Sequence, residues 1–335
     1  MKNGSRFGKM VLTCAAVTLS CLLAACGDQG SSSKESESRV RKSAQEDQEG
    51  QKNSTFDEDS NWEENDITSE NELLVKDDRM NPDEITAENA EFQGECGPNA
   101  HWYLKDYTLV IRGTGEVKKA PWNSSELDDQ GLDSTRMIHH LIVEEGITSL
   151  CKDLMHQGWS LTSVELPESL TEIGEGAFWD CEKLPSIVIP YGVTEIKGMA
   201  FNSCDNLSEV ILPDGLNKIG PAVFVNCSSL KSIVIPETVT EISQQAFAGS
   251  ALKEIEIPEN VEKIGNCAFA GCPNLETVII RSEVAKLDKY AFSGCKKLKY
   301  VEIPSGVKEI GMGAFENCGD GSLKIVYDGP ADLSK

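Results

Sequence analysis

Apolar residues recur at a nearly constant interval along the second half of this chain. Each unit begins with two apolar positions two residues apart, passes a proline and a second pair of apolar positions, and in most copies ends in Ala-Phe with Cys three residues later. The phenylalanine is the clearest marker, at spacings of 23, 23, 23, 22, 23 and 23 residues: Phe178, Phe201, Phe224, Phe247, Phe269, Phe292 and Phe315. A period in this range is typical of a solenoid, in which each unit buries its apolar face only against its neighbours.

The alternation within one unit predicts the path of the chain. In Ile187-Val188-Ile189-Pro190 the period of two places Ile187 and Ile189 on the inner side, and Pro190 ends the strand because it has no N–H to continue a ladder. A second short extended segment and a short helical turn at the phenylalanine complete the unit. Since stacked strands lie about 4.8 Å apart, about eight turns predict a rod roughly 40 Å long.

Some copies depart from this unit. One residue is missing between Phe247 and Pro258, and Ser250 stands where most copies have cysteine. Arg281 occupies the proline position of its copy, so we expect that strand to run on. Met155 takes the place of the phenylalanine in the first copy. After the last copy the pattern ends in a predicted closing strand that contains Leu323, Ile325 and Val326.

The unit Ile-x-Ile-Pro-x-x-Val-x-x-Ile-Gly-x-x-Ala-Phe-x-x-Cys resembles the bacterial BspA-type leucine-rich repeat. It is seen at residues 187–204 (with Lys197 in place of the glycine), 233–249 and 301–318. The resemblance implies a leucine-rich-repeat solenoid, mostly β with short helical turns, over residues 138–327. It also implies a surface-exposed protein without catalytic residues, and some proteins of this type bind host matrix proteins or other cells.

A different pattern precedes the repeats at residues 91–137. Glycine turns separate short apolar runs between Cys96-Gly97 and Pro121-Trp122, and this stretch is similar to the segment that often precedes BspA-type repeats. We interpret it as a small β-rich N-terminal cap, because a bare solenoid end would expose apolar surface and strand edges. Trp102 and Trp122 are either buried in this cap or exposed for carbohydrate binding, and the first reading is favoured.

The chain begins like an exported protein. Lys2, Arg6 and Lys9 precede an apolar run that is too short for a membrane span, and the run ends in Leu23-Ala24-Ala25-Cys26. This tetrapeptide resembles the bacterial lipobox, which implies a lipoprotein signal peptide at 1–25 and lipidation of Cys26. We therefore expect an extracytoplasmic chain that is lipid-anchored to a bacterial membrane. The alternative is an ordinary signal peptide with Cys26 incidental.

The next stretch has the composition of a disordered tether. Residues 27–90 contain 19 Asp or Glu and 7 Lys or Arg, with few large apolar residues and no sustained period. The predicted tether, residues 26–90, would lift the solenoid from the membrane. Residues 328–335 are a short C-terminal tail.

Charge and residue patterns exclude several function classes. The formal net charge of −24 would repel the phosphates of nucleic acids. His139 and His140 are adjacent and would point to opposite faces of a strand, which is poor metal geometry. No phosphate loop or nucleophile elbow is recognisable. We therefore expect no catalytic residues, no metal, no cofactor and no nucleic-acid partner.

The cysteines share one slot of the repeat. Six lie three residues after a phenylalanine: Cys181, Cys204, Cys227, Cys272, Cys295 and Cys318. Stacked neighbours would come within disulfide distance, but their Cβ vectors would run parallel. The slot is therefore read as a small buried apolar position, with a thiol or metal ladder as the alternative.

The outward positions of the first strand of each unit carry the functional hypothesis. From copy to copy the residue between the two inward ones is Ile142, Glu165, Val188, Ile211, Val234, Glu256, Ile279 and Glu302. We predict a protein-binding surface, for host matrix or another cell surface, at Val188, Ile211, Val234, Ile279 and Tyr300. The alternative is that β-branched residues simply suit strands, in an envelope-spacing lipoprotein without a dedicated ligand.

Overall fold

The computed structural model describes residues 80–123, 134–281, 286–327 and 329. The predicted signal peptide, the lipidation site Cys26, the tether before residue 80 and the tail apart from residue 329 lie outside these residues. Within the described ranges, no helix has the length and apolar character needed to cross a membrane.

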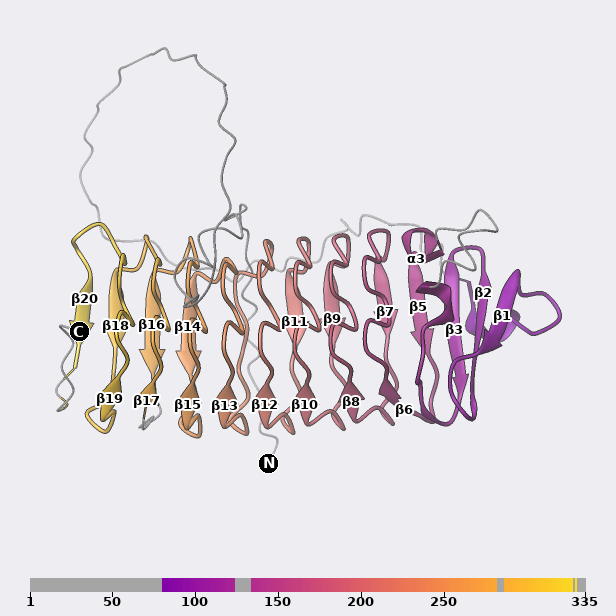
Figure 1. Cartoon of the computed structure of the whole chain (residues 1–335), viewed down its shortest axis with the longest axis horizontal. Helices are drawn as coiled ribbons and strands as arrows, with labels where there is room; N and C mark the ends of the chain where they lie inside the picture. Colours follow the sequence, from indigo (N-terminus) through magenta and orange to yellow (C-terminus); the bar gives the residue numbers. More distant parts are fainter. Residues whose placement is uncertain (1–79, 124–133, 282–285, 328, 330–335) are drawn as a thin grey trace, which may run out of the picture. The chain divides into compact units, whose positions relative to one another are not determined.

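The repeats coil into a solenoid of stacked rungs, and each rung contributes up to two short parallel strands (Figure 1). One ladder of strands is a nine-stranded sheet. Its members are β4 (Gly115–Glu116), β6 (Ile147–Leu150), β8 (Glu172–Ile173), β10 (Glu195–Ile196), β12 (Lys218–Ile219), β13 (Glu241–Ile242), β15 (Lys263–Ile264), β17 (Lys286–Leu287) and β19 (Glu309–Ile310). Strands of neighbouring rungs pair one repeat apart, as Glu195 and Lys218 do. This register confirms the solenoid and its period.

The second ladder of strands is divided into three sheets. Five strands in the order β1-β2-β3-β5-β7 form the first, β9 and β11 the second, and β14-β16-β18-β20 the third. The repeat strands are β5 (His140–Val143), β7 (Ser163–Glu165), β9 (Ser186–Val188), β11 (Glu209–Ile211), β14 (Glu254–Ile257), β16 (Thr277–Ile280), β18 (Tyr300–Glu302) and the predicted closing strand β20 (Lys324–Val326). We call the outward side of this ladder the strand face. The rung at 232–235 belongs to it but forms no strand.

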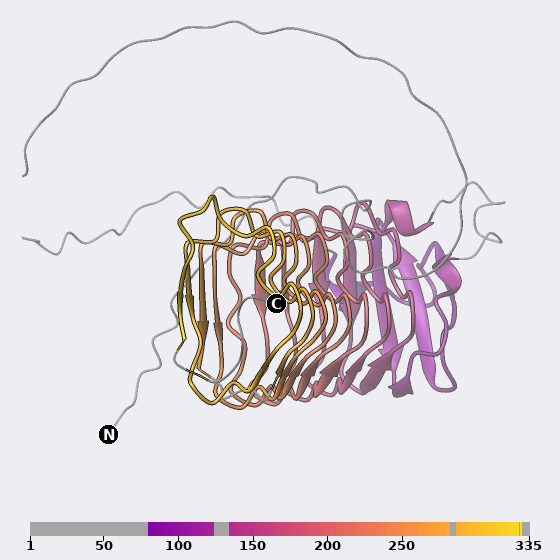
Figure 2. The same ribbon diagram turned by 60° about the vertical axis from the view of Figure 1, so that its left-hand side comes forward.

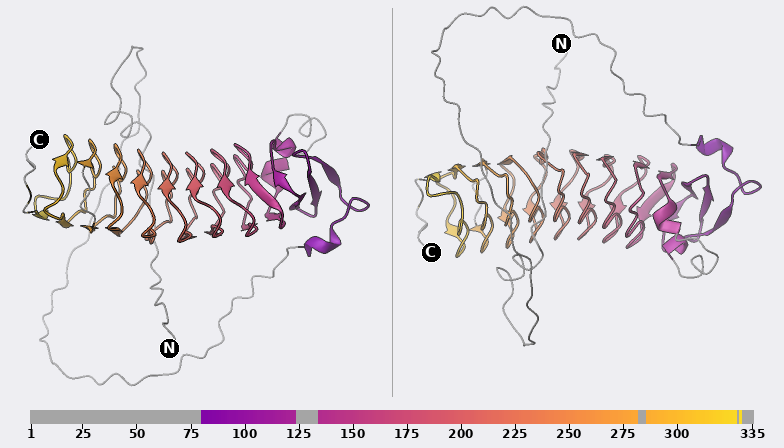
Figure 3. Two further views of the ribbon diagram at one scale, coloured as in Figure 1. Left: turned by 90° about the horizontal axis from the view of Figure 1, so that it is seen from below. Right: turned by 90° about the horizontal axis from the view of Figure 1, so that it is seen from above.

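The rungs keep the same orientation along the solenoid, one behind another (Figure 2, Figure 3). The reason lies in the core, where the marker phenylalanines form one continuous stack. The centroids of neighbouring rings lie 5.1 to 5.6 Å apart, with interplanar angles of 4° to 14°. Met155 takes the place of the ring in its rung and is fully buried. Each ring therefore packs on the rings of the rungs before and after it, within the aliphatic core.

The turns that carry the phenylalanines are short but are not helices. Around Phe201 the backbone has positive φ at Met199 (59°) and Ser203 (57°), and equivalent positions recur in the other rungs. A residue of this kind interrupts a right-handed helix. It also lets the N–H of Phe201 donate to the carbonyl of Val223 in the next rung at 3.0 Å. The turn therefore adds a third line of hydrogen bonds between rungs.

The cysteine slot is buried in these turns. Cys181, Cys204, Cys272 and Cys295 carry free thiols without exposed surface. Each Sγ donates to a carbonyl of the preceding rung, as Cys204 does to Phe178 at 3.1 Å. Burial raises the pKa of Cys204 above its ordinary value. The slot is thus a packing position whose thiols also satisfy backbone carbonyls.

The cap precedes the first rung as an antiparallel hairpin that joins the parallel ladder. It contains β1 (Phe92–Glu95), β2 (Ala100–Lys105), β3 (Thr108–Gly113), the 3-10 turn η2 (Pro121–Asn123) and the short helix α3 (Ser134–Met137). Trp102 and Trp122 are 4% and 1% exposed and meet edge to face at 5.7 Å. Trp122 Nε1 donates to the carbonyl of Leu154 at 2.8 Å, so this ring fastens the cap to the first rungs. Burial on this scale excludes stacking of either ring on a sugar.

Residues 80–90, which the sequence places in the tether, pack on the cap. The 3-10 turn η1 (Pro82–Glu84) leads to Ile85, which is fully buried against Val110 and Ile142 on the strand face. The guanidinium of Arg112 donates to the carbonyls of Pro82 and Ile85. The cap therefore begins earlier than residue 91, because apolar outward residues of the sheet are covered by this segment.

Candidate functional site

The structure brings three of the predicted binding residues together on the strand face. Val188, Ile211 and Val234 occupy equivalent positions in successive rungs and are 59%, 46% and 73% exposed. Val188 and Ile211 are direct partners in the register of β9 and β11. We call these three residues the apolar stripe. Tyr191 lies three residues after Val188, just beyond the end of β9, and is also largely exposed. The repeat pattern did not single it out.

The other two predicted residues lie further along and are half-buried. Ile279 and Tyr300 belong to β16 and β18 of the four-stranded sheet. The hydroxyl of Tyr300 donates to Glu302 Oε2 at 3.0 Å, and this hydrogen bond to the carboxylate raises the pKa of Tyr300. Tyr300 is therefore partly engaged within its own sheet and does not extend the apolar stripe.

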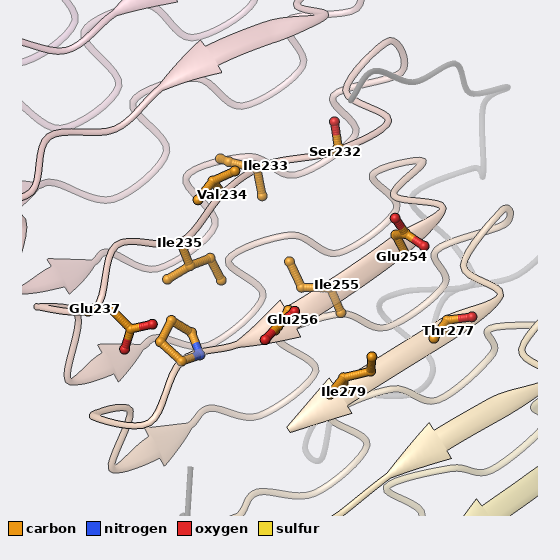
Figure 4. Close-up of a pocket in the computed structure, with 11 residues that line it drawn as sticks. Ser232, Ile233, Val234, Ile235, Glu237, Glu254, Ile255, Glu256, Thr277 and Ile279 are labelled. Atoms are coloured by element: carbon orange, nitrogen blue, oxygen red, sulfur yellow. The ribbon is translucent and has the colours of Figure 1, made fainter. Parts of the chain in front are cut away.

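A groove opens beside the stripe, between the rung at 232–237 and β14 (Figure 4). Its volume is about 350 Å³. The lining residues are Ser232, Ile233, Val234, Ile235, Glu237, Glu254, Ile255, Glu256, Pro258, Thr277 and Ile279. Val234 of the stripe and the predicted residue Ile279 thus reach the same depression from different rungs.

The groove results from lost pairing on the strand face. Residues 232–235 form no backbone hydrogen bond with the rung on either side, although all three rungs lie within the described residues. The two rungs are linked at either end of this stretch, where Lys253 N donates to Lys231 O at 3.2 Å and Asn260 Nδ2 donates to Glu237 O at 2.8 Å. Pro258 has no N–H to donate across this gap, as is also true of the prolines at the same position in most other rungs. Where Arg281 replaces proline, its N–H donates to the carbonyl of Ile257 at 2.9 Å.

The opening is confined to the strand face. On the opposite ladder Lys218 pairs with Glu241 and Glu241 with Lys263 in regular register. In the core the rings of Phe224 and Phe247 remain 5.3 Å apart. The short repeat provides the sequence signal, since residues 250–252 contain one residue fewer than the corresponding loops. The period alone did not reveal that the missing residue would accompany a groove.

The rim of the groove is acidic. Glu256 forms an ion pair with Arg281, whose Nε lies 2.8 Å from its Oε1. The carboxylates of Glu237 and Glu254 are exposed and have no ion-pair partner in the described part of the chain. The site therefore combines apolar side chains, unpaired backbone groups and uncompensated negative charge.

The described residues contain no comparable site for a metal ion. Across the described ranges, no three His, Cys, Asp or Glu side chains converge in a way that could hold a metal ion. His139 stacks on Tyr107 with ring centroids 4.9 Å apart, and His140 is buried with Nδ1 2.8 Å from Ser163 Oγ. These two histidines serve packing and local hydrogen bonding.

Comparison with known proteins bears first on the fold. The chain is similar to a leucine rich cell surface protein from Faecalibacterium prausnitzii, with 23% identity and a TM-score of 0.51 over 72% of this chain and 78% of that one. It is also similar to a leucine rich repeat protein of T. pallidum, with 21% identity and a TM-score of 0.40 over 67% and 87% of the two chains. The likeness to the Faecalibacterium prausnitzii protein, at 23% identity, shows the fold alone. No curated protein matches the chain.

Family membership rests on the repeats themselves. The family described as BspA type leucine rich repeat region matches residues 148–276 and 219–327, in six copies. These ranges contain the phenylalanine stack, most of the strand face and the groove. The protein belongs to the BspA-type leucine-rich-repeat family.

Proposed function

We propose that this protein is a lipid-anchored bacterial cell-surface module that binds a protein partner through its strand face. The observation that carries the proposal is the exposed apolar stripe of Val188, Ile211 and Val234. Membership of a repeat family built as a binding scaffold supports it, because a solenoid offers a long surface without needing a reaction centre.

The stripe is suited to anchor a partner but not to hold it alone. Three side chains of this size expose on the order of 150 Å², which corresponds to about 4 kcal/mol if fully buried. Tyr191 adds an aromatic side chain of the kind enriched among dominant interface residues. Polar contacts around the stripe must supply the remaining affinity and the specificity.

The sequence supports the proposed attachment, and the resemblance to BspA-type proteins supports the proposed partner class. Leu23-Ala24-Ala25-Cys26 supports lipidation of Cys26, so the module would face the exterior on a membrane. Host matrix proteins or proteins of another cell surface are the partners that this location offers. The net charge of −24 disfavours nucleic acid. We assign the module no enzymatic activity and no cofactor.

Binding by the whole chain to a panel of purified matrix proteins tests the function. We expect saturable, salt-resistant binding that is lost in the triple variant Val188→Asp, Ile211→Asp and Val234→Asp. The matched control carries Thr171→Asp, Thr194→Asp and Thr240→Asp, which add the same charge on exposed positions beside the nine-stranded sheet. Binding that survives the first variant would move the site elsewhere, and a panel without any binding would favour an envelope-spacing role.

The anchor is tested separately by the variant Cys26→Ala. Expressed in a bacterium, the unchanged chain should partition into detergent and incorporate a labelled fatty acid. The variant should lose both properties and appear in the aqueous fraction. Incorporation of label by the variant would refute lipidation at this cysteine.

A further inference from the structure

We propose that the groove between residues 232–237 and 254–258 binds an extended, basic segment of the partner protein, partly through backbone hydrogen bonds. This inference rests on the proposed function and deepens it, because it names the chemistry of the segment and the rung that receives it. The groove lies at the end of the apolar stripe and shares Val234 with it.

The first argument is the unpaired backbone. A parallel rung normally donates and accepts hydrogen bonds on both sides, yet residues 232–235 form none with either neighbour. Ser232, Ile233 and Ile235 are buried, and all four residues of this stretch line the groove. Leaving such groups unsatisfied is unfavourable, and an extended peptide offers N–H and C=O groups at matching intervals.

The second argument is the size and lining of the groove. A volume of about 350 Å³ is within the range of sites that hold small ligands or a few residues of a peptide. Ile255 and Ile279 supply apolar surface on one wall and Val234 on the other (Figure 4). An apolar side chain of the bound segment would be removed from water between these walls.

The third argument is charge, which selects among occupants. Glu237 and Glu254 form no ion pair in the described part of the chain, so a lysine or arginine beside the apolar residue would find a partner at the rim. A second copy of this chain, at net charge −24, would be repelled. The same holds for residues 27–90 of the chain itself, with 19 acidic and 7 basic residues. An external basic segment is the occupant that fits.

The cap provides a precedent on the same face. There Ile85 from an added segment covers the outward residues Val110 and Ile142, and Arg112 reaches the carbonyls of that segment. The strand face thus accepts an irregular segment where its outward residues are apolar. At the groove the described chain supplies no such cover.

A defined peptide tests the inference with the whole chain. The probe is an acetylated, amidated and fluorescently labelled octapeptide of alternating valine and lysine, and binding is followed by anisotropy. We expect saturable binding, with no binding of the corresponding valine and glutamate peptide. Two further probes carry N-methyl groups on the valine or on the lysine nitrogens, and at least one of them should bind about tenfold more weakly because it cannot donate backbone hydrogen bonds. Equal affinity of both methylated probes would overturn backbone pairing.

Charge reversal locates the peptide. Glu254→Lys should weaken binding about tenfold through repulsion at the rim. Glu209→Lys is the matched control, because Glu209 is exposed at the equivalent position of an earlier rung outside the groove and changes the net charge equally. Equal losses in the two variants would show general attraction to an acidic protein and would overturn the assignment.

The results also separate this inference from the proposed function. Matrix-protein binding that depends on the apolar stripe, together with no peptide binding, would leave the function standing and refute the groove. Peptide binding that depends on Glu254 would support the groove, even if the matrix panel gave no partner. Failure of both assays would refute both proposals.

Discussion

Removing one ring from the phenylalanine stack tests how the solenoid is held together. Phe247 is fully buried, and its ring lies 5.3 Å from Phe224 and 5.1 Å from Phe269. Phe247→Ala leaves a cavity and removes two aromatic contacts, each worth about 0.5 to 1.5 kcal/mol. Together with the lost burial, we expect the free energy of unfolding to fall by about 4 kcal/mol.

The end of the stack provides the matched control. Phe315 is half-buried and has one ring neighbour in the described chain, Phe292, at 5.5 Å. Phe315→Ala should therefore cost about half as much, roughly 2 kcal/mol. Urea unfolding of the whole chain, followed by circular dichroism and by tryptophan fluorescence, measures both variants. Equal losses would refute the reasoning, because they would show that neighbouring rings do not determine the contribution of each rung.

Two further predictions concern ionisable groups. Cys318 and Cys151 are both half-buried, but the neighbouring Cys295 side chain lowers the pKa of Cys318, whereas burial raises the pKa of Cys151 to about 12. At pH 8 iodoacetamide should thus modify Cys318 first, as followed by peptide mapping, and faster modification of Cys151 would contradict this. Glu241 lies 3.3 Å from Lys218 and 3.2 Å from Lys263; burial raises its pKa, but hydrogen bonds from both lysines and from Ser243 lower it overall. Because its pKa is lower in the folded state, the carboxylate stabilises the fold above its unfolded pKa near 4.5, and this contribution is lost as pH falls through the folded value. Glu241→Gln should therefore cost about 1 kcal/mol at pH 7 and less at pH 3 by urea titration, and an equal cost at both pH values would refute it.

The repeat pattern predicted the parts of the fold that depend on local order. Alternation placed Ile187 inside and Val188 outside, and the structure agrees. The spacing of the phenylalanines predicted stacked repeat units with Met155 at the phenylalanine position of the first one, and Met155 is fully buried there. These features could be predicted from the sequence because equivalent residues have the same surroundings in every rung. The pattern of one unit therefore holds for the others.

The backbone conformation of the turns at the phenylalanines could not be predicted from the sequence. Alanine before phenylalanine favours a short helical turn, but residues such as Met199 adopt positive φ and direct N–H groups to the next rung. Hydrogen bonds between rungs decide this conformation. A pattern within one unit carries no information on them.

The strand face shows where sequence ends and tertiary structure begins. The sequence determined the solenoid and the list of outward residues, because side-chain direction along a strand depends only on local alternation. Only the tertiary structure decided that Ile142 is covered by Ile85, that Ile279 is half-buried, and that Val234 lies at an open groove. Exposure and pairing depend on segments distant in sequence and on hydrogen bonds between rungs, and the repeat period specifies neither of these.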